Sequence, residues 1–192
     1  MTINLPNIFT LFRILILPVF VIIFYLPVHW SDILCAVLFA IAAFTDWIDG
    51  YLARKLNQET PFGAFFDPVA DKLIVAVALV LLVGKHGTPW LAIPASVIIC
   101  REIMVSALRE WMAELGKRAH VAVSYIGKCK TALQMISIFV LLLTKKIDSF
   151  DNPLVMTGYV MVYLAAILTL WSMWLYLRAA WPSLTLTKDA NS

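Results

Sequence analysis

The sequence predicts an all-α, polytopic membrane protein with six transmembrane helices. Apolar residues make up 62% of its 192 positions and charged residues only 14%, whereas an average soluble domain is roughly half apolar and a quarter charged. A helix needs about 20 apolar residues to cross a bilayer, and the chain contains six runs of about that length. A chain of this length has no room for a second, soluble domain besides them.

The starts of several predicted helices carry residues that commonly cap helices. The six helices are expected at residues 5–28, 32–55, 68–86, 89–115, 120–145 and 152–180. The capping positions are Ser31 and Asp32 for the second helix, and the pairs Asp67-Pro68, Thr88-Pro89 and Asn152-Pro153 for the third, fourth and sixth. We therefore assign residues 1–182 to a single membrane domain and residues 183–192 to a polar C-terminal tail.

The basic residues predict the orientation of the helices. An even number of spans places both termini on one side of the membrane. Of the fifteen Lys and Arg residues, only Lys85, Lys145 and Lys146 fall on the other side. Because Lys and Arg accumulate in cytoplasmic loops, both termini are expected to be cytoplasmic. The net charge of +3 is too small to suggest nucleic acid as a partner.

Four aspartates fall on the expected cytoplasmic side. Asp46 and Asp49 lie near the end of the second predicted helix, and Asp67 and Asp71 near the start of the third. Spacings of three and four residues place each pair on one face of its helix. The two helices are antiparallel neighbours with a short connection, so the pairs are expected to face each other across a cleft near the membrane surface.

Four carboxylates in one cleft predict a metal site, because they repel one another unless cations compensate their charge. Two divalent cations supply the missing +4, and ligands that are all oxygen suit Mg²⁺ or Mn²⁺. A pair of metal ions about 4 Å apart neutralises a pyrophosphate and stabilises the attacking and leaving oxygens during transfer at phosphorus. The aspartates thus predict phosphorus chemistry.

The aspartates belong to a longer pattern, D-x2-D-G-x2-A-R-x8-G-x3-D-x3-D. Its fixed positions are Asp46, Asp49, Gly50, Ala53, Arg54, Gly63, Asp67 and Asp71. This pattern resembles the signature of the CDP-alcohol phosphatidyltransferase family, membrane enzymes that move a phosphatidyl group from a CDP-linked lipid to an alcohol. The stretches PNIFTLFRI, REIMVSALREWMAELGK and IGKCKTALQM resemble the bacterial branch, and the resemblance covers about residues 4–135.

The resemblance implies a homodimer in the bacterial cytoplasmic (inner) membrane, with six helices around a polar cavity that faces the cytoplasm and holds two metal ions. It implies transfer from CDP-diacylglycerol to sn-glycerol 3-phosphate, giving phosphatidylglycerophosphate and CMP for the synthesis of phosphatidylglycerol and cardiolipin. A sister enzyme that uses inositol phosphate, serine or phosphatidylglycerol is the alternative. A divalent-cation transporter is more remote, because it needs ligands near the bilayer midplane.

The resemblance also implies roles for the residues of the signature. Asp46, Asp49 and Asp67 are expected to bind metal, and Asp71 to bind the second ion and act as the general base on the acceptor hydroxyl. The residues expected to line the CDP-lipid site are Asn7, Thr10, Arg13, Gly50, Ala53, Arg54 and Gly63.

A phosphorylated acceptor needs a cationic pocket, for which we expect Arg101, Arg109 and Lys130. The two arginines are two helical turns apart and so project similarly, and their guanidinium groups suit phosphate. Glu102 and Glu110 follow them directly and are placed to orient them. The further basic residues Lys117, Arg118 and Lys128 have the alternative role of contacting anionic lipid headgroups.

Overall fold

The computed structural model describes residues 5–56, 61–114, 125–144 and 152–185. Within these residues every regular element is an α-helix, which confirms the all-α part of the prediction. The helices are α1 (Leu5–Tyr25), α2 (Ser31–Leu56), α3 (Pro61–His86), α4 (Pro89–Glu114), α5 (Tyr125–Leu143) and α6 (Pro153–Thr185).

The predicted starts of α2, α4 and α6 are confirmed within one residue. α2 begins at Ser31, and α4 and α6 each begin at the proline that follows the predicted cap. At the start of α6, the side-chain oxygen Oδ1 of Asn152 accepts a hydrogen bond of 3.0 Å from the backbone N–H of Leu154. This contact satisfies one of the N–H groups that a helix start leaves without an intrahelical partner.

The predicted start of α3 is wrong, because this helix begins at Pro61 and not at residue 68. Asp67 and Pro68 therefore lie inside the helix, and Asp67 is not its cap. A proline already has the backbone φ of a helix, although it lacks one N–H donor, and such residues are tolerated in membrane helices. The longer helix carries Gly63, Asp67 and Asp71 at intervals of four residues, so all three lie near one face.

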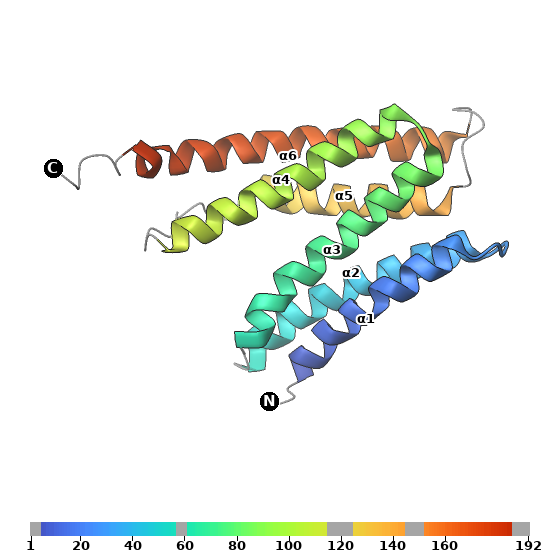
Figure 1. Cartoon of the computed structure of the whole chain (residues 1–192), viewed down its shortest axis with the longest axis horizontal. Coiled ribbons are helices and arrows are strands. Elements are labelled where there is room, and N and C mark those ends of the chain that lie inside the picture. The colour runs from blue at the N-terminus through green and yellow to red at the C-terminus, as the bar shows by residue number, and fades with distance from the viewer. Residues whose placement is uncertain (1–4, 57–60, 115–124, 145–151, 186–192) are drawn as a thin grey trace.

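Figure 1 shows two groups of helices, with α1 and α2 in one and α4, α5 and α6 in the other, and α3 running obliquely between them. α5 packs against α6 and also contacts α2 and α3, while α1 contacts α2 and α3. At one end of the bundle α1 begins and α2 ends. At the opposite end α1 ends and α2 begins.

A glycine allows α5 and α6 to pack closely. A Cβ atom placed on Gly158 of α6 would come within 2.6 Å of Cδ2 of Leu141 on α5, which is shorter than any normal carbon–carbon contact. Leu141 is itself fully buried, so its side chain has little space into which to move. Close approach of helices through small residues is typical of membrane proteins.

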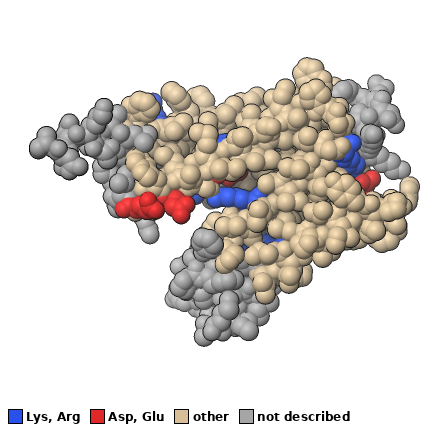
Figure 2. Space-filling model, viewed as in Figure 1, with Lys and Arg blue, Asp and Glu red and all other residues tan. Residues whose placement is uncertain are grey.

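The outer surface is largely apolar, as the uncharged surface in Figure 2 illustrates. Among the large exposed side chains are Ile22 (62% exposed), Ile103 (64%) and Trp174 (64%). α4 and the part of α6 from Pro153 to Trp181 are long and apolar enough to cross a membrane, and the described parts of α1, α2 and α5 contain shorter apolar helical segments. Apolar surface of this extent is consistent with a membrane protein.

Candidate active site

α3 supplies two of the predicted metal ligands. Asp67 and Asp71 lie one turn apart and are both half-buried, and the buried Gly63 lies one turn before Asp67. Arg13 of α1 is almost completely buried, and its Nη2 atom lies 3.9 Å from Oδ1 of Asp67. The structure thus brings one predicted CDP-lipid residue of α1 next to a predicted metal ligand of α3.

A second polar group joins α4, α5 and α6, and we call it the acceptor cluster: Arg101, Glu102, Lys130 and Ser172. The Oε1 atom of Glu102 accepts a hydrogen bond of 3.0 Å from Nη1 of Arg101 and one of 2.6 Å from Nζ of Lys130. The Nη2 atom of Arg101 donates a bond of 2.6 Å to Oγ of Ser172. The cluster therefore holds two predicted acceptor-site cations around one carboxylate oxygen.

The guanidinium of Arg101 also lies over an aromatic ring, which fixes its plane further. Its Cζ atom is 5.8 Å from the centre of the Tyr176 ring on α6, a distance at which the ring attracts a cation. The side chains of Arg101 and Lys130 are only 8% and 6% exposed. Burial makes their ionic hydrogen bonds stronger than they would be in water.

α3 connects the acceptor cluster with the aspartates. The Asp71 carboxylate is near enough to Lys130 to attract its ammonium group electrostatically. The neighbouring Lys72 donates a hydrogen bond to Oγ of Ser106 on α4, and this hydroxyl donates one of 2.7 Å to the backbone carbonyl of Glu102. Figure 2 shows a hollow between the two groups of helices, with Lys and Arg atoms at its inner wall.

Several predicted site residues lie outside the described side chains. The backbone of α2 is helical through Asp46, Asp49, Gly50, Ala53 and Arg54, and that of α1 is helical at Asn7 and Thr10. The helical backbone agrees with the spacing argument for Asp46 and Asp49. With only two of the four aspartate side chains described, no group of three possible metal ligands occurs within the described part.

The structure separates the two predicted acceptor arginines. Arg101 is buried in the acceptor cluster, whereas Arg109 and Glu110 are both exposed further along α4. A shared helical face thus does not imply a shared environment. The expectation that Glu102 contacts Arg101 is met, and the same carboxylate also binds Lys130, which the spacing argument did not anticipate.

Sequence reasoning missed four residues that complete this region: Lys72, Ser106, Ser172 and Tyr176. Lys72 was counted only among the basic residues that set the orientation. Ser172 and Tyr176 are one turn apart in α6, and a polar pair at this spacing in a long apolar helix is a signal that was available. However, Arg101, to which Ser172 is hydrogen-bonded, lies 71 residues away along the chain.

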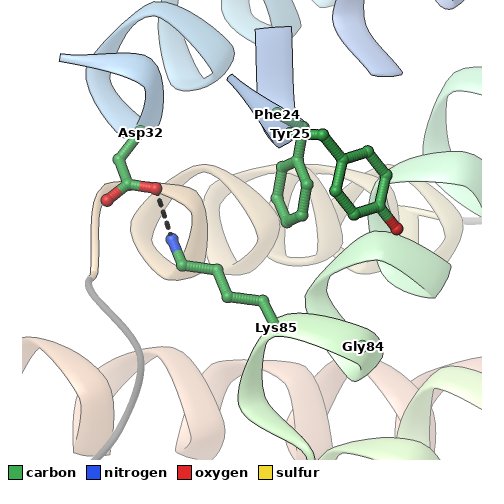
Figure 3. Close-up of a pocket in the computed structure, with 5 residues that line it drawn as sticks. All are labelled: Phe24, Tyr25, Asp32, Gly84 and Lys85. Carbon is green, nitrogen blue, oxygen red and sulfur yellow. Dashed lines mark hydrogen bonds and ion pairs between the residues drawn. The ribbon is translucent and has the colours of Figure 1, made fainter. Parts of the chain in front are cut away.

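A separate cavity of about 350 Å³ lies at the opposite end of the bundle, lined by Phe24, Tyr25, Asp32, Gly84 and Lys85 (Figure 3). The Nζ atom of Lys85 donates a hydrogen bond of 2.7 Å to Oδ1 of Asp32 and further bonds to the backbone carbonyls of Leu142 and Thr144. Lys85 lies in the last turn of α3, and through these bonds it links the start of α2 to the end of α5. Its contacts indicate a structural role.

The fold and the site together define a class of protein: an apolar helical bundle whose polar site combines half-buried carboxylates with buried cations. A family model described as CDP-alcohol phosphatidyltransferase matches residues 3–175, and the chain belongs to this family. The match extends well beyond residue 135 and includes most of α6, which now contributes Ser172 to the site.

Three curated relatives match the chain over nearly its whole length. The protein from Pseudomonas fluorescens is 55% identical over 187 residues, covering 94% of this chain and 92% of the relative. That from Yersinia enterocolitica is 51% identical over 184 residues (96% and 98%), and that from Pectobacterium atrosepticum is 52% identical over 180 residues (94% and 96%). All three are named CDP-diacylglycerol–glycerol-3-phosphate 3-phosphatidyltransferase.

Proposed function

We propose that this protein transfers the phosphatidyl group of CDP-diacylglycerol to sn-glycerol 3-phosphate, giving phosphatidylglycerophosphate and CMP for the synthesis of phosphatidylglycerol and cardiolipin. Relatives that are 51–55% identical over nearly the full length carry this reaction in their names. The observation that supports a phosphorylated acceptor is the pair of buried cations, Arg101 and Lys130, of which Lys130 is also attracted by Asp71. An acceptor with a phosphate group needs such a cationic pocket, whereas serine does not.

We place the protein in the bacterial inner membrane as a homodimer. Its six helices cross the bilayer with both termini in the cytoplasm and a polar cavity open to that side. The exposed apolar side chains support the membrane location. The distribution of Lys and Arg supports the orientation, and Lys85, one of the few basic residues on the other side, is compensated by Asp32.

The aspartates of α2 and α3 form the proposed metal site. Asp67 and Asp71 are half-buried, one turn apart, and offer only oxygen atoms, a donor set that fits Mg²⁺ or Mn²⁺. Asp46, Asp49 and Asp67 would hold the ions together with Asp71. When bound, two such ions neutralise the pyrophosphate of the CDP-lipid and stabilise charge on the reacting oxygens.

The CDP-lipid occupies the part of the site formed by α1, α2 and the start of α3. Arg13 lies next to Asp67 there, and Gly63, on the same face of α3, has no side chain to occupy the space. We assign the lining of this part to Asn7, Thr10, Arg13, Gly50, Ala53, Arg54 and Gly63.

The acceptor occupies the part formed by α4, α5 and α6. Arg101 and Lys130 bind its phosphate, and Arg109 contributes at the exposed margin. Because Asp71 lies close enough to attract Lys130, a phosphate held by Lys130 brings the acceptor's hydroxyl group towards Asp71. Asp71 takes the proton from this hydroxyl, the oxygen attacks the phosphorus of the phosphatidyl group, and the bond to CMP breaks. Positioning and electrostatics supply most of the rate enhancement in such a step.

The identity of the product tests this function. Purified enzyme in mixed micelles with CDP-diacylglycerol and Mg²⁺ is given sn-glycerol 3-phosphate, inositol phosphate, serine or phosphatidylglycerol in parallel. We expect phosphatidylglycerophosphate and CMP in equal amounts from the first acceptor, and only trace products from the others. A preference for another acceptor would identify a sister enzyme and contradict the proposal.

A further inference from the structure

Glu102 is the least buried member of the charged group that it holds together. Its side chain is 24% exposed, compared with 8% for Arg101 and 6% for Lys130. Both cations donate to the same oxygen atom of Glu102. A ligand that approaches the two cations from outside therefore meets the Glu102 carboxylate first.

The cluster has more positive charge and more donors than Glu102 can satisfy. Two cations face one carboxylate, and the Nε atom of Arg101 is buried without a hydrogen-bond partner among the described residues. Lys130 has three N–H donors, of which one goes to Glu102. Two cations that converge on one anionic oxygen have the geometry that also binds an oxygen of a phosphate group.

Arg101 and Lys130 differ in how much they depend on Glu102. Arg101 is also held by Ser172 and by the ring of Tyr176, both on α6, so it keeps its place if Glu102 moves away. Lys130 is a flexible side chain whose hydrogen-bond partner here is Glu102, although Asp71 attracts it as well. If Glu102 leaves, Lys130 is therefore able to turn towards a new anion beside Asp71.

We propose that Glu102 occupies the position of the acceptor's phosphate in the acceptor-free enzyme and is displaced when that phosphate binds between Arg101 and Lys130. The inference rests on the proposed function, which assigns these two cations to the acceptor. A phosphate monoester with two negative charges competes successfully with a single carboxylate. A neutral alcohol leaves the contacts of Glu102 intact, so Glu102 also determines specificity by excluding acceptors without a phosphate.

Replacing Glu102 by Gln tests the proposal, because Gln keeps the shape of the side chain and removes the competing charge. Inorganic phosphate serves as the probe, and we expect it to inhibit competitively against sn-glycerol 3-phosphate. We expect Glu102→Gln to lower the inhibition constant for phosphate and the KM for sn-glycerol 3-phosphate by about tenfold, since a nearby negative charge no longer opposes the dianion. The KM for CDP-diacylglycerol should not change.

Thermal unfolding of the purified protein gives a readout that is independent of activity. Without the Glu102 carboxylate the two buried cations lose the anion that both of them bind, so Glu102→Gln should unfold at a lower temperature than the wild type. Inorganic phosphate should then raise its unfolding temperature by more than it raises that of the wild type, because the ligand binds the folded variant more tightly. Glu114→Gln, which alters an exposed carboxylate on the same helix, is the control and should match the wild type in both measurements.

If Glu102 only orients the two cations, its replacement should have the opposite effect on the two constants. In that case Glu102→Gln would raise the KM for sn-glycerol 3-phosphate and the inhibition constant for phosphate, and either a rise or no change overturns the proposal. If Glu102→Gln does not fold, Glu102→Asp is measured in the same way. Its shorter carboxylate competes less well, so the inhibition constant should fall by about threefold, and an unchanged or higher value is again contradictory.

Different results would contradict the proposed function and the proposed role of Glu102. If wild-type enzyme does not use sn-glycerol 3-phosphate, or if phosphate does not compete with it, the assignment of the acceptor fails. If the wild type behaves as expected and only the Glu102 variants respond in the wrong direction, the displacement of Glu102 fails and the acceptor assignment stands.

Discussion

Replacing Asp71 by Asn is expected to lower kcat by about 10²- to 10⁴-fold, which is the usual contribution of a general base. The amide keeps an oxygen atom at the metal site but cannot take a proton from the acceptor hydroxyl. Binding of CDP-diacylglycerol should therefore persist, because Asp67 and the residues around Arg13 are unchanged. Steady-state kinetics with both substrates varied, together with a binding measurement for the CDP-lipid, separate the two effects.

Glu114→Gln is a suitable control for this variant, since it removes an exposed carboxylate of α4 and should leave kcat unchanged. An Asp71→Asn enzyme with near-normal turnover would refute the assignment of Asp71 as the base. Loss of CDP-lipid binding together with turnover would instead assign Asp71 to ligand binding alone.

Replacing Lys130 by Met is expected to raise the KM for sn-glycerol 3-phosphate by about 100-fold, the order expected when a buried ionic hydrogen bond to phosphate is lost. Met retains most of the length and the apolar stem of the side chain. Glu102 still has Arg101 as its partner in this variant, so the cluster keeps a compensated carboxylate. The KM for CDP-diacylglycerol should stay within about twofold, because the residues assigned to the CDP-lipid lie on α1, α2 and the start of α3.

The matched control is Arg178→Gln, which removes an exposed positive charge from α6 without touching the acceptor cluster. This variant should bind sn-glycerol 3-phosphate like the wild type. If Lys130→Met instead changes only the KM for CDP-diacylglycerol, then Lys130 belongs to the CDP-lipid part of the site and not to the acceptor part.

The helices themselves were largely predictable from sequence, because they depend on local properties of the chain. Apolar runs and capping residues are read directly, as at Asn152, whose side chain caps α6. The start of α3 was predicted incorrectly since Asp67-Pro68 has the local pattern of a helix start, while the structure continues the helix back to Pro61. A proline is compatible both with the first turn of a helix and with the interior of a membrane helix, so the local pattern does not decide between the two starts.

The candidate site was predictable in part: Arg101 and Lys130 were expected in one pocket and share a carboxylate, whereas Arg109 is exposed although it was expected beside Arg101. Asp67 and Asp71 lie on one face because of their spacing, and Glu102 contacts Arg101 because it is adjacent to it. The approach of Lys130 to the same carboxylate depends on how α4 and α5 each pack against α6 and α3. The contact of Ser172 with Arg101 likewise depends on the packing of α6 against α4, and no periodicity within one helix predicts it.

Electron paramagnetic resonance of Mn²⁺ bound to the purified protein tests most directly whether the four aspartates form one catalytic metal site. In the presence of CDP-diacylglycerol we expect about two Mn²⁺ ions per chain with a magnetically coupled spectrum, as for a pair about 4 Å apart. Asp67→Asn and Asp49→Asn should each abolish the coupling, because they remove ligands from α3 and α2 respectively. Uncoupled ions, or a coupled spectrum that survives both substitutions, would contradict the proposed site.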